Sequence, residues 1–127
     1  MTTYLLDTSV IIDVLNAKRQ RDVLLRQLLL DGNLLACCAI NVTEVYAGMR
    51  TQEKPQTKAF IESLDYFGIT REVAGLAGQL KRDWADKGIT LSVSDVTIAA
   101  VVLSNKLVLM TDNVRHYPMP DLRRHDL

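Results

Sequence analysis

The sequence predicts a single α/β domain: a central, mostly parallel sheet of about four or five strands, flanked by helices on both faces. Short, almost purely apolar segments alternate along the chain with segments whose apolar residues recur at helical spacing. Strands that are buried on both faces have this continuous apolar character. A length of 127 residues suits one hydrophobic core, and no linker, repeat or low-complexity segment divides the chain. We therefore expect one domain over residues 1–127.

Three segments are predicted as buried strands, at Thr3–Leu6, Leu34–Ile40 and Leu107–Met110. Phe67–Ile69 is expected to form a short extended piece, and the tail from Asn113 is expected to be mostly loop with at most a short edge strand. Helical spacing and stop signals such as Gly32 and Gly88 predict the intervening helices. These are expected at residues 9–17, 22–31, from 41, 58–66, 70–87 and after 95.

Charge and cysteine content exclude several classes of protein. Fifteen basic residues balance fifteen acidic ones, which argues against long-range capture of nucleic acid by the whole molecule but permits a local basic surface. No apolar run is long enough to span a bilayer, and the acidic Asp7 and Asp13 make a signal peptide unexpected, so we expect a cytoplasmic protein. Cys37 and Cys38 are neighbours that would face opposite sides of a strand, and both are predicted to be free and buried.

Four carboxylates fall near the ends of predicted strands or the starts of helices. Asp7 directly follows the first strand, and Glu44 lies early in the helix after the second. Asp95 opens the helix before the last strand, and Asp112 follows that strand. Ligand sites in parallel α/β folds lie outside the carboxyl ends of the strands, so all four acids could share one end of the sheet.

Helix capping is the alternative explanation for each acid taken alone. Asp7 could cap the helix that begins near Ser9, and the spacings Asn41 to Glu44 and Ser92 to Asp95 fit capping boxes. Capping does not explain why the acids gather at one end of the sheet. Two carboxylates ~4 Å apart repel by about 4 kcal/mol at an effective dielectric near 20, so such a cluster favours a divalent cation. Oxygen ligands without His or Cys select Mg²⁺ or Mn²⁺.

Four spaced motifs carry a resemblance to a known family. In order along nearly the whole chain, they read YLLDTSVIID, NVTEVYAGM, SVSDVTIAA and LVLMTDNVRHY. Together they resemble the PIN-domain nucleases, and most closely the VapC toxins of bacterial toxin–antitoxin modules. The resemblance implies Mg²⁺- or Mn²⁺-dependent endonucleolytic cleavage of RNA. It also implies a homodimer and a VapB-type antitoxin whose tail blocks the acidic pocket.

The resemblance also assigns roles to particular residues. Asp7, Glu44 and Asp95 match the three principal acids of the family, with Asp7 and Asp95 as the direct metal ligands. The fourth position is either Asp112 or its neighbour Asn113. Ser9 and Thr111 match polar positions that support the site. The implied mechanism is in-line attack on an RNA phosphodiester by metal-activated water.

Basic and apolar residues suggest further surfaces. Arg50 and Arg115 are candidates for contact with RNA phosphates, because each follows an acidic motif, although a solvated surface would explain them equally. The same holds for other basic residues that could rim the pocket, namely Lys18, Arg19, Arg21 and Lys54. Apolar residues at 22–35 and 58–67 outnumber what one core face needs and suggest a groove for a partner.

Two other classes of function compete with a nuclease. A phosphoacceptor receiver-like domain would want an acidic pair after the first strand and an acceptor Asp after a middle strand, where this chain has a lone Asp7 and Asn41. A haloacid-dehalogenase-like phosphatase would need Asp in place of Ser9. A catalytically silent binding module would be favoured if the acids pointed in different directions.

Overall fold

A five-stranded, entirely parallel sheet forms the centre of the computed structural model, which describes residues 1–127. The strands lie in the order β3-β2-β1-β4-β5, with β1 in the middle. Leu5 of β1 pairs with Ala36 of β2, and Leu6 pairs with Met110 of β4. The strand bounds are β1 Thr3–Leu6, β2 Leu34–Cys38, β3 Asp65–Phe67, β4 Val108–Thr111 and β5 Arg124–Asp126. The predicted α/β fold with a parallel sheet is confirmed.

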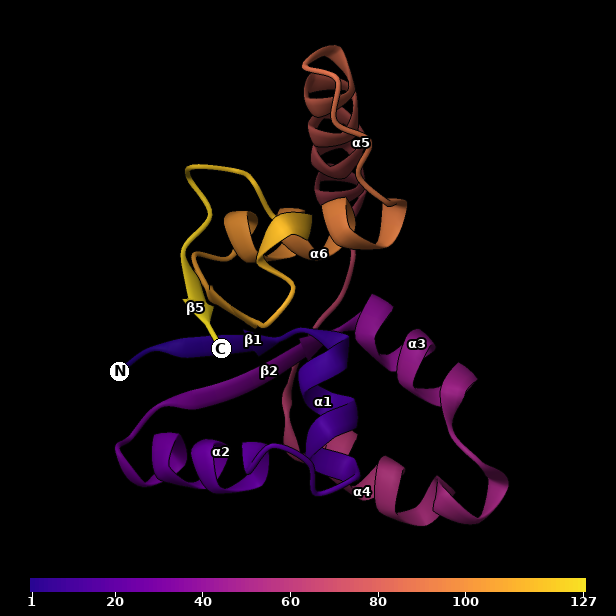
Figure 1. Ribbon diagram of the computed structural model, residues 1–127, viewed down its shortest axis with the longest axis vertical. Helices are drawn as coiled ribbons and strands as arrows, with labels where there is room; N and C mark the ends of the chain where they lie inside the picture. The colour runs from indigo at the N-terminus through magenta and orange to yellow at the C-terminus, as the bar shows by residue number, and fades with distance from the viewer.

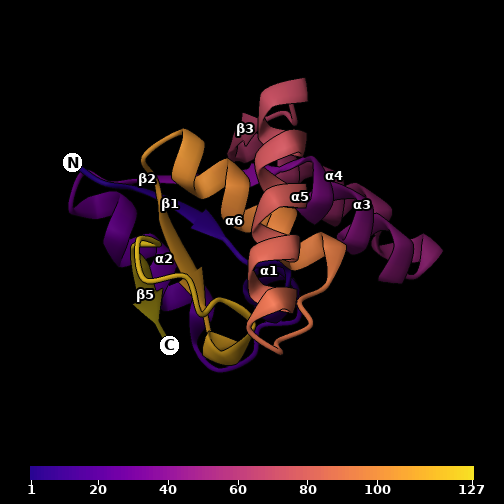
Figure 2. The same cartoon turned by 90° about the horizontal axis from the view of Figure 1, so that it is seen from above.

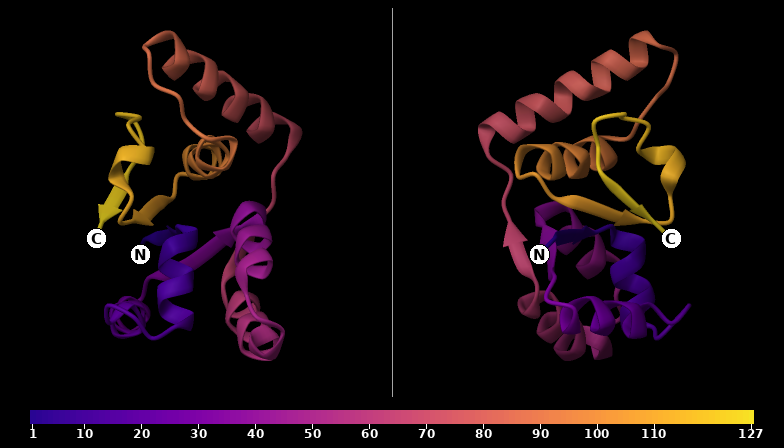
Figure 3. Two further views of the ribbon diagram at one scale, coloured as in Figure 1. Left: turned by 45° about the vertical axis from the view of Figure 1, so that its right-hand side comes forward. Right: turned by 90° about the vertical axis from the view of Figure 1, so that its left-hand side faces the viewer.

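Helices cover both faces of this sheet. Figure 1 shows α5 and α6 on one side and α1, α2 and α4 on the other, and the two views of Figure 3 show the same layers. Viewed from above, α5 lies over α6 (Figure 2). None of the helices combines the length and the apolar character needed to cross a membrane. The helix bounds are α1 Thr8–Leu15, α2 Arg21–Leu30, α3 Ala39–Gly48, α4 Lys54–Ser63, α5 Arg71–Asp86 and α6 Val93–Ser104, with 3-10 turns η1 Thr51–Glu53 and η2 Val114–His116.

Alternate residues of each strand feed two separate cores. Leu5 and Cys38 pack in the core beneath α5 and α6, whereas Leu6, Cys37 and Met110 pack in the core on the opposite face. This alternation follows from the two-residue repeat of a strand. Cys37 and Cys38 therefore point to opposite faces, and both are free and buried, as the sequence predicts.

The second strand is shorter than predicted. It ends at Cys38, and α3 already begins at Ala39, so Asn41 lies inside the helix rather than at its cap. The side-chain oxygen of Asn41 accepts a hydrogen bond from the Cys38 backbone N–H at 2.8 Å. The predicted capping box, in which Glu44 reaches back to Asn41, is therefore wrong. The sequence is continuously apolar across this boundary, and such a pattern fits a buried strand and a buried helix equally well. It therefore does not show where the strand ends.

Other boundaries also move, and α6 begins at Val93 rather than after Asp95. Helix α4 begins at Lys54, with Pro55 in its first turn, instead of at Lys58. Proline is well suited to that place, because its missing N–H would be unpaired there anyway. Strand β3 occupies Asp65–Phe67, two residues before the predicted extended piece. The short edge strand allowed for in the tail exists as β5.

The order of the strands creates a natural place for a site. The chain builds β1, β2 and β3 outward in one direction, then crosses back to add β4 and β5 on the other side of β1. In open α/β sheets, ligands bind where the strand order reverses, outside the carboxyl ends of the strands. That place is the gap between the ends of β1 and β4. Asp7 and Asp112 directly follow these two strands.

Candidate active site at the ends of β1 and β4

Asp7 is both the cap of α1 and the buried centre of the site. One carboxylate oxygen accepts a hydrogen bond from the Thr8 backbone N–H at 2.9 Å, and the other accepts one from the Thr111 hydroxyl at 2.7 Å. Burial raises the pKa of Asp7 above its ordinary value, and the nearby charge of Asp95 raises it further. Hydrogen bonds from Thr111, Tyr117 and Thr8 oppose this rise because they stabilise the ionised form.

Asp95 comes from the opposite layer of the fold. It lies in the first turn of α6, where the Ser92 hydroxyl caps the helix by accepting a hydrogen bond from the Asp95 N–H at 3.0 Å. One oxygen of the Asp95 carboxylate lies 3.3 Å from Nδ1 of His116. A carboxylate at this position is favoured by the helix dipole.

Tyr117 brings the first two acids together. Its hydroxyl lies 3.0 Å from Oδ1 of Asp7 and 3.3 Å from Oδ1 of Asp95. Burial raises the pKa of Tyr117, and the two carboxylate charges raise it further, so the phenol remains a protonated donor. Sequence patterns do not predict a role for this residue, because an aromatic side chain beside a proline in a charged tail has no pattern that points to a site.

Glu44 connects to Asp7 through a single residue. The Thr8 hydroxyl donates to Oε1 of Glu44 at 2.7 Å, while the Thr8 backbone N–H bonds Asp7. The amide of Asn41 donates to the same hydroxyl at 3.0 Å and so fixes its orientation. Neither Thr8 nor Asn41 was singled out as a supporting residue. The position of Thr8, directly after Asp7 at the start of a helix, was the available signal.

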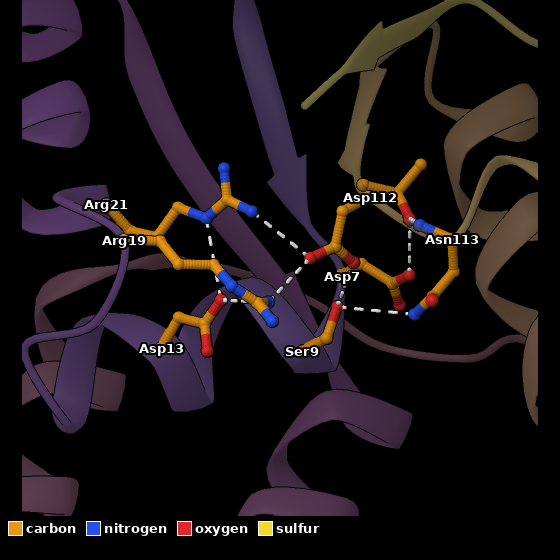
Figure 4. Close-up of polar contacts among 8 residues, drawn as sticks. Asp7, Ser9, Asp13, Arg19, Arg21, Asp112 and Asn113 are labelled. Carbon is orange, nitrogen blue, oxygen red and sulfur yellow. Dashed lines mark hydrogen bonds and ion pairs between the residues drawn. The ribbon is translucent and has the colours of Figure 1, made fainter.

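Asp112 faces a pair of arginines (Figure 4). One of its oxygens accepts from the Ser9 hydroxyl at 3.0 Å, and the other lies 3.1 Å from the Arg21 guanidinium and 3.4 Å from that of Arg19. Asn113 donates its backbone N–H to the Thr111 hydroxyl at 2.9 Å, and its side-chain amide lies 3.4 Å from Ser9. Ser9 and Thr111 thus link both candidates for the fourth position to the rest of the site.

Arg19 and Arg21 also hold a further acid, Asp13 of α1 (Figure 4). The Arg21 side chain is only 12% exposed and spans Asp13 and Asp112, whereas that of Arg19 is 65% exposed. Two carboxylates and two guanidinium groups balance in charge here. These arginines were predicted to rim the acidic pocket, and their contacts are with acids at its edge.

The two arginines predicted to contact substrate lie in different settings. Arg50 pairs with Glu53 at 3.2 Å, and its polar contacts do not reach the acids. Arg115 lies in η2 and lines a hollow together with Asp112, Asn113, Val114 and His116. Of the two, Arg115 is therefore the one that adjoins the acidic residues.

The carboxylates of Asp7 and Asp95 are candidate ligands for a metal ion. No group of three or more His, Cys, Asp or Glu side chains is arranged so that it could hold a metal ion by itself. Mg²⁺ does not require one, because it is commonly held by one or two carboxylates together with water and substrate phosphates. Oδ2 of Asp7 and Oδ1 of Asp95 each accept one hydrogen bond, and Oδ2 of Asp95 lies 3.3 Å from Nδ1 of His116, so each of these oxygens keeps further acceptor capacity. This all-oxygen pair fits a hard divalent cation.

Comparisons with known proteins place the chain in a family. The model of the PIN domain family matches residues 4–121. Ribonuclease VapC19 of Mycobacterium tuberculosis is 32% identical over 120 residues, which cover 94% of this chain and 96% of the relative. Ribonuclease VapC2 of Haemophilus influenzae is 26% identical over 122 residues, covering 92% and 91% of the two chains.

Solved structures share the fold at lower identity. The crystal structure of VapBC2 from Rickettsia felis, bound to a DNA fragment from their promoter, matches with a TM-score of 0.88 at 20% identity over 99% of both chains. The DNA-bound VapBC of Salmonella typhimurium matches with a TM-score of 0.84 at 22% identity, over 99% of this chain and 98% of that one. From the family match and the identity to VapC19, we conclude that the chain belongs to the PIN-domain family and, within it, to the VapC group.

Proposed function

We propose that this protein is a metal-dependent endoribonuclease and the toxin of a VapBC-type toxin–antitoxin module. The curated relatives are named as VapC ribonucleases, and the structural neighbours are VapBC complexes. One observation within the molecule carries the proposal. Asp7 and Asp95 come from opposite layers of the fold, yet their carboxylates approach the same hydroxyl at the point where the strand order reverses.

In this proposal Asp7 and Asp95 hold Mg²⁺, or Mn²⁺ in its place. Such an ion, when bound, supplies a Lewis acid that activates water and offsets charge on a phosphoryl group. Glu44 is exposed whereas Asp7 is buried, and in this proposal Glu44 orients the attacking water. Thr8 holds Glu44 and Asp7 in a fixed relation, because it bonds both.

The other predicted residues act around this centre. We assign Asp112 to a supporting role, because Ser9 and the two arginines already engage both of its oxygens. Asn113, Ser9 and Thr111 keep the ends of the two strands together. Arg115 is placed to contact an RNA phosphate, and Arg50 is the more distant candidate.

An apolar groove offers a place for the antitoxin. It lies between α2, α4 and the edge of the sheet, and it coincides with the two apolar segments that the sequence analysis assigned to a partner. Leu29 is 51% exposed there and presents an unpartnered apolar surface. We propose that an apolar antitoxin segment docks in this groove, whose apolar lining is Val14, Leu25, Leu29, Leu34, Leu35, Phe60 and Leu64. The homodimer and the cytoplasmic location stay predictions.

The competing functions lack comparable support. A silent binding module was expected to have acids that point in different directions, whereas here Tyr117 contacts Asp7 and Asp95, and Thr8 connects Glu44 to Asp7. A receiver-like domain would need an acceptor Asp after a middle strand. It would also need an acidic pair after the first strand, where this chain has the lone Asp7, and the second strand, β2, runs directly into α3, which carries Asn41 and no Asp.

The proposal is tested by RNA cleavage with purified protein in Mg²⁺, Mn²⁺ or EDTA, beside Asp7→Asn and Asp95→Asn. We expect EDTA to abolish cleavage and each variant to lose about 100-fold or more while still melting cooperatively. Glu72→Gln is the matched control, because Glu72 also lies in the first turn of a helix but away from the site. Cleavage at the parental rate by both folded Asn variants would refute the proposed roles.

A further inference from the structure

Tyr117 occupies an unusual place for a residue of a C-terminal tail. Its side chain is fully buried and belongs to the core beneath α5 and α6. Figure 3 shows the segment that carries it folded beside α6. Its backbone is fixed as well, because its N–H bonds the Val114 carbonyl and its own carbonyl accepts from the Arg124 guanidinium at 2.6 Å. The phenol is therefore held rigidly where it meets the acids.

The hydroxyl of this rigid ring lies between two groups that repel each other. Oδ1 of Asp7 and Oδ1 of Asp95 both lie within hydrogen-bond distance of it, at 3.0 and 3.3 Å. A phenol has one proton, so it can donate fully to one carboxylate at a time or share the proton between them. Either arrangement reduces the repulsion between the two charges. Asp7 and Asp95 belong to elements that no backbone hydrogen bond joins at this point.

We propose that Tyr117 is a positioning residue for the divalent cation, an inference that rests on the proposed function. Its hydroxyl holds the Asp7 and Asp95 carboxylates at one spacing and orientation before the ion binds. Groups that hydrogen-bond to metal ligands orient them, and their removal typically weakens metal affinity by about 10- to 100-fold. The phenol itself does not contact the substrate in this proposal. It acts through the two acids.

Two other roles for the hydroxyl lead to different results. If it competes with the cation for the same carboxylate oxygens, its removal will tighten metal binding. If the ring simply fills the core, removal of the hydroxyl will leave metal affinity unchanged. Tyr117→Phe separates these roles, because it keeps the ring and removes only the oxygen.

The experiment measures Mn²⁺ binding to the parent and to Tyr117→Phe by titration calorimetry, with thermal melts of the metal-free proteins. We expect the Kd for Mn²⁺ to rise about tenfold while the metal-free variant still melts cooperatively. Tyr4→Phe is the matched control, because the Tyr4 ring lies in β1 but packs against His125 instead of the acids. That variant should bind Mn²⁺ like the parent.

The outcomes also separate this inference from the proposed function. An unchanged or lower Kd in folded Tyr117→Phe overturns the positioning role, whatever the nuclease activity. If the parent binds Mn²⁺ but cleaves no RNA, the nuclease proposal fails, while a raised Kd in the variant still supports the role of Tyr117. If the parent binds no divalent cation at all, both proposals fall together.

Discussion

Asp7 shows how one residue can serve both the fold and the site. Its backbone carbonyl begins α1, its side chain caps that helix, and the same carboxylate accepts from Thr111 and Tyr117. From the sequence alone, helix capping and metal binding are alternative explanations of this carboxylate. The geometry makes them compatible, because the start of a helix is where a carboxylate is favoured and where it faces the end of the sheet.

Thr8 bonds both Asp7 and Glu44, and its hydroxyl should matter for catalysis as well as for stability. Thr8→Val removes the hydroxyl that donates to Glu44 and keeps both the shape of the side chain and the N–H that bonds Asp7. A hydrogen bond to a charged group contributes about 1.5–3 kcal/mol, so we expect RNA cleavage to fall by about tenfold or more. Cleavage rates and urea unfolding of the same samples check this.

Thr43→Val provides the matched control for this substitution. Thr43 lies on the same helix as Glu44, and its hydroxyl donates only to the Ala39 carbonyl within that helix. We expect this variant to cleave RNA at the parental rate. Equal activity in Thr8→Val and Thr43→Val would show that the contact with Glu44 has no part in the reaction.

The predictability of the site residues depends on how each differs from its surroundings. Asp7, Glu44 and Asp95 could be proposed because a charged residue beside an apolar run is conspicuous. Tyr117 could not, because a buried aromatic residue looks the same in sequence whether its hydroxyl is used or not. The contact of Asp112 with Arg21 was also out of reach, since it joins residues 91 positions apart.

At the scale of elements, helix α6 delivers Asp95 to the site, and its N-cap should matter for both stability and activity. Ser92→Ala removes the hydroxyl that caps the Asp95 N–H, which typically costs about 1 kcal/mol of stability. Because Asp95 lies in the turn that this cap fixes, we expect Ser92→Ala to need a higher Mn²⁺ concentration than the parent to reach half of its maximal cleavage rate. Urea unfolding and a Mn²⁺ titration of cleavage measure the two effects.

Ser94→Ala tests whether the loss of stability in Ser92→Ala comes from the missing cap. Ser94 lies in the same first turn but is not the capping residue. We expect its replacement to change stability by less than about 0.5 kcal/mol. If Ser92→Ala and Ser94→Ala destabilise the protein equally, the cap is not what holds this turn.

Element boundaries were predictable where a capping residue or a clear change of pattern marks them. The helix predicted at 70–87 is α5, which Thr70 caps, and β1 spans the predicted residues. The junction between β2 and α3 was misplaced because both elements are apolar and buried there. Its true position depends on the bond from the Cys38 N–H to Asn41, which forms only once the chain has turned into the helix.

At the scale of the whole molecule, the order of the strands could not be derived from the pattern of apolar residues. Periodicity identifies strands and helices one at a time, and it does not state that β1 lies between β2 and β4. That central position is what brings Asp7 beside Thr111 and, through Tyr117, beside Asp95. The gathering of the acids is therefore a property of the assembled sheet.

The groove between α2 and α4 is likewise a product of the assembled fold, and it yields a prediction about inhibition. Leu29→Glu places a charge in the apolar lining without disturbing the core, because this side chain is already half exposed. An apolar antitoxin segment would lose burial and meet an unpaired charge, so we expect its affinity to fall by about 100-fold or more. RNA cleavage by Leu29→Glu alone should match the parent.

Val23→Glu is the control that makes this test specific to the groove. Val23 lies on the same helix and is 57% exposed, but it does not line the groove. With the cognate antitoxin added in increasing amounts, Val23→Glu should be inhibited like the parent, and Leu29→Glu should continue to cleave RNA. If the antitoxin inhibits all three proteins equally, it must reach the acids from another surface, and the groove between α2 and α4 is not its docking site.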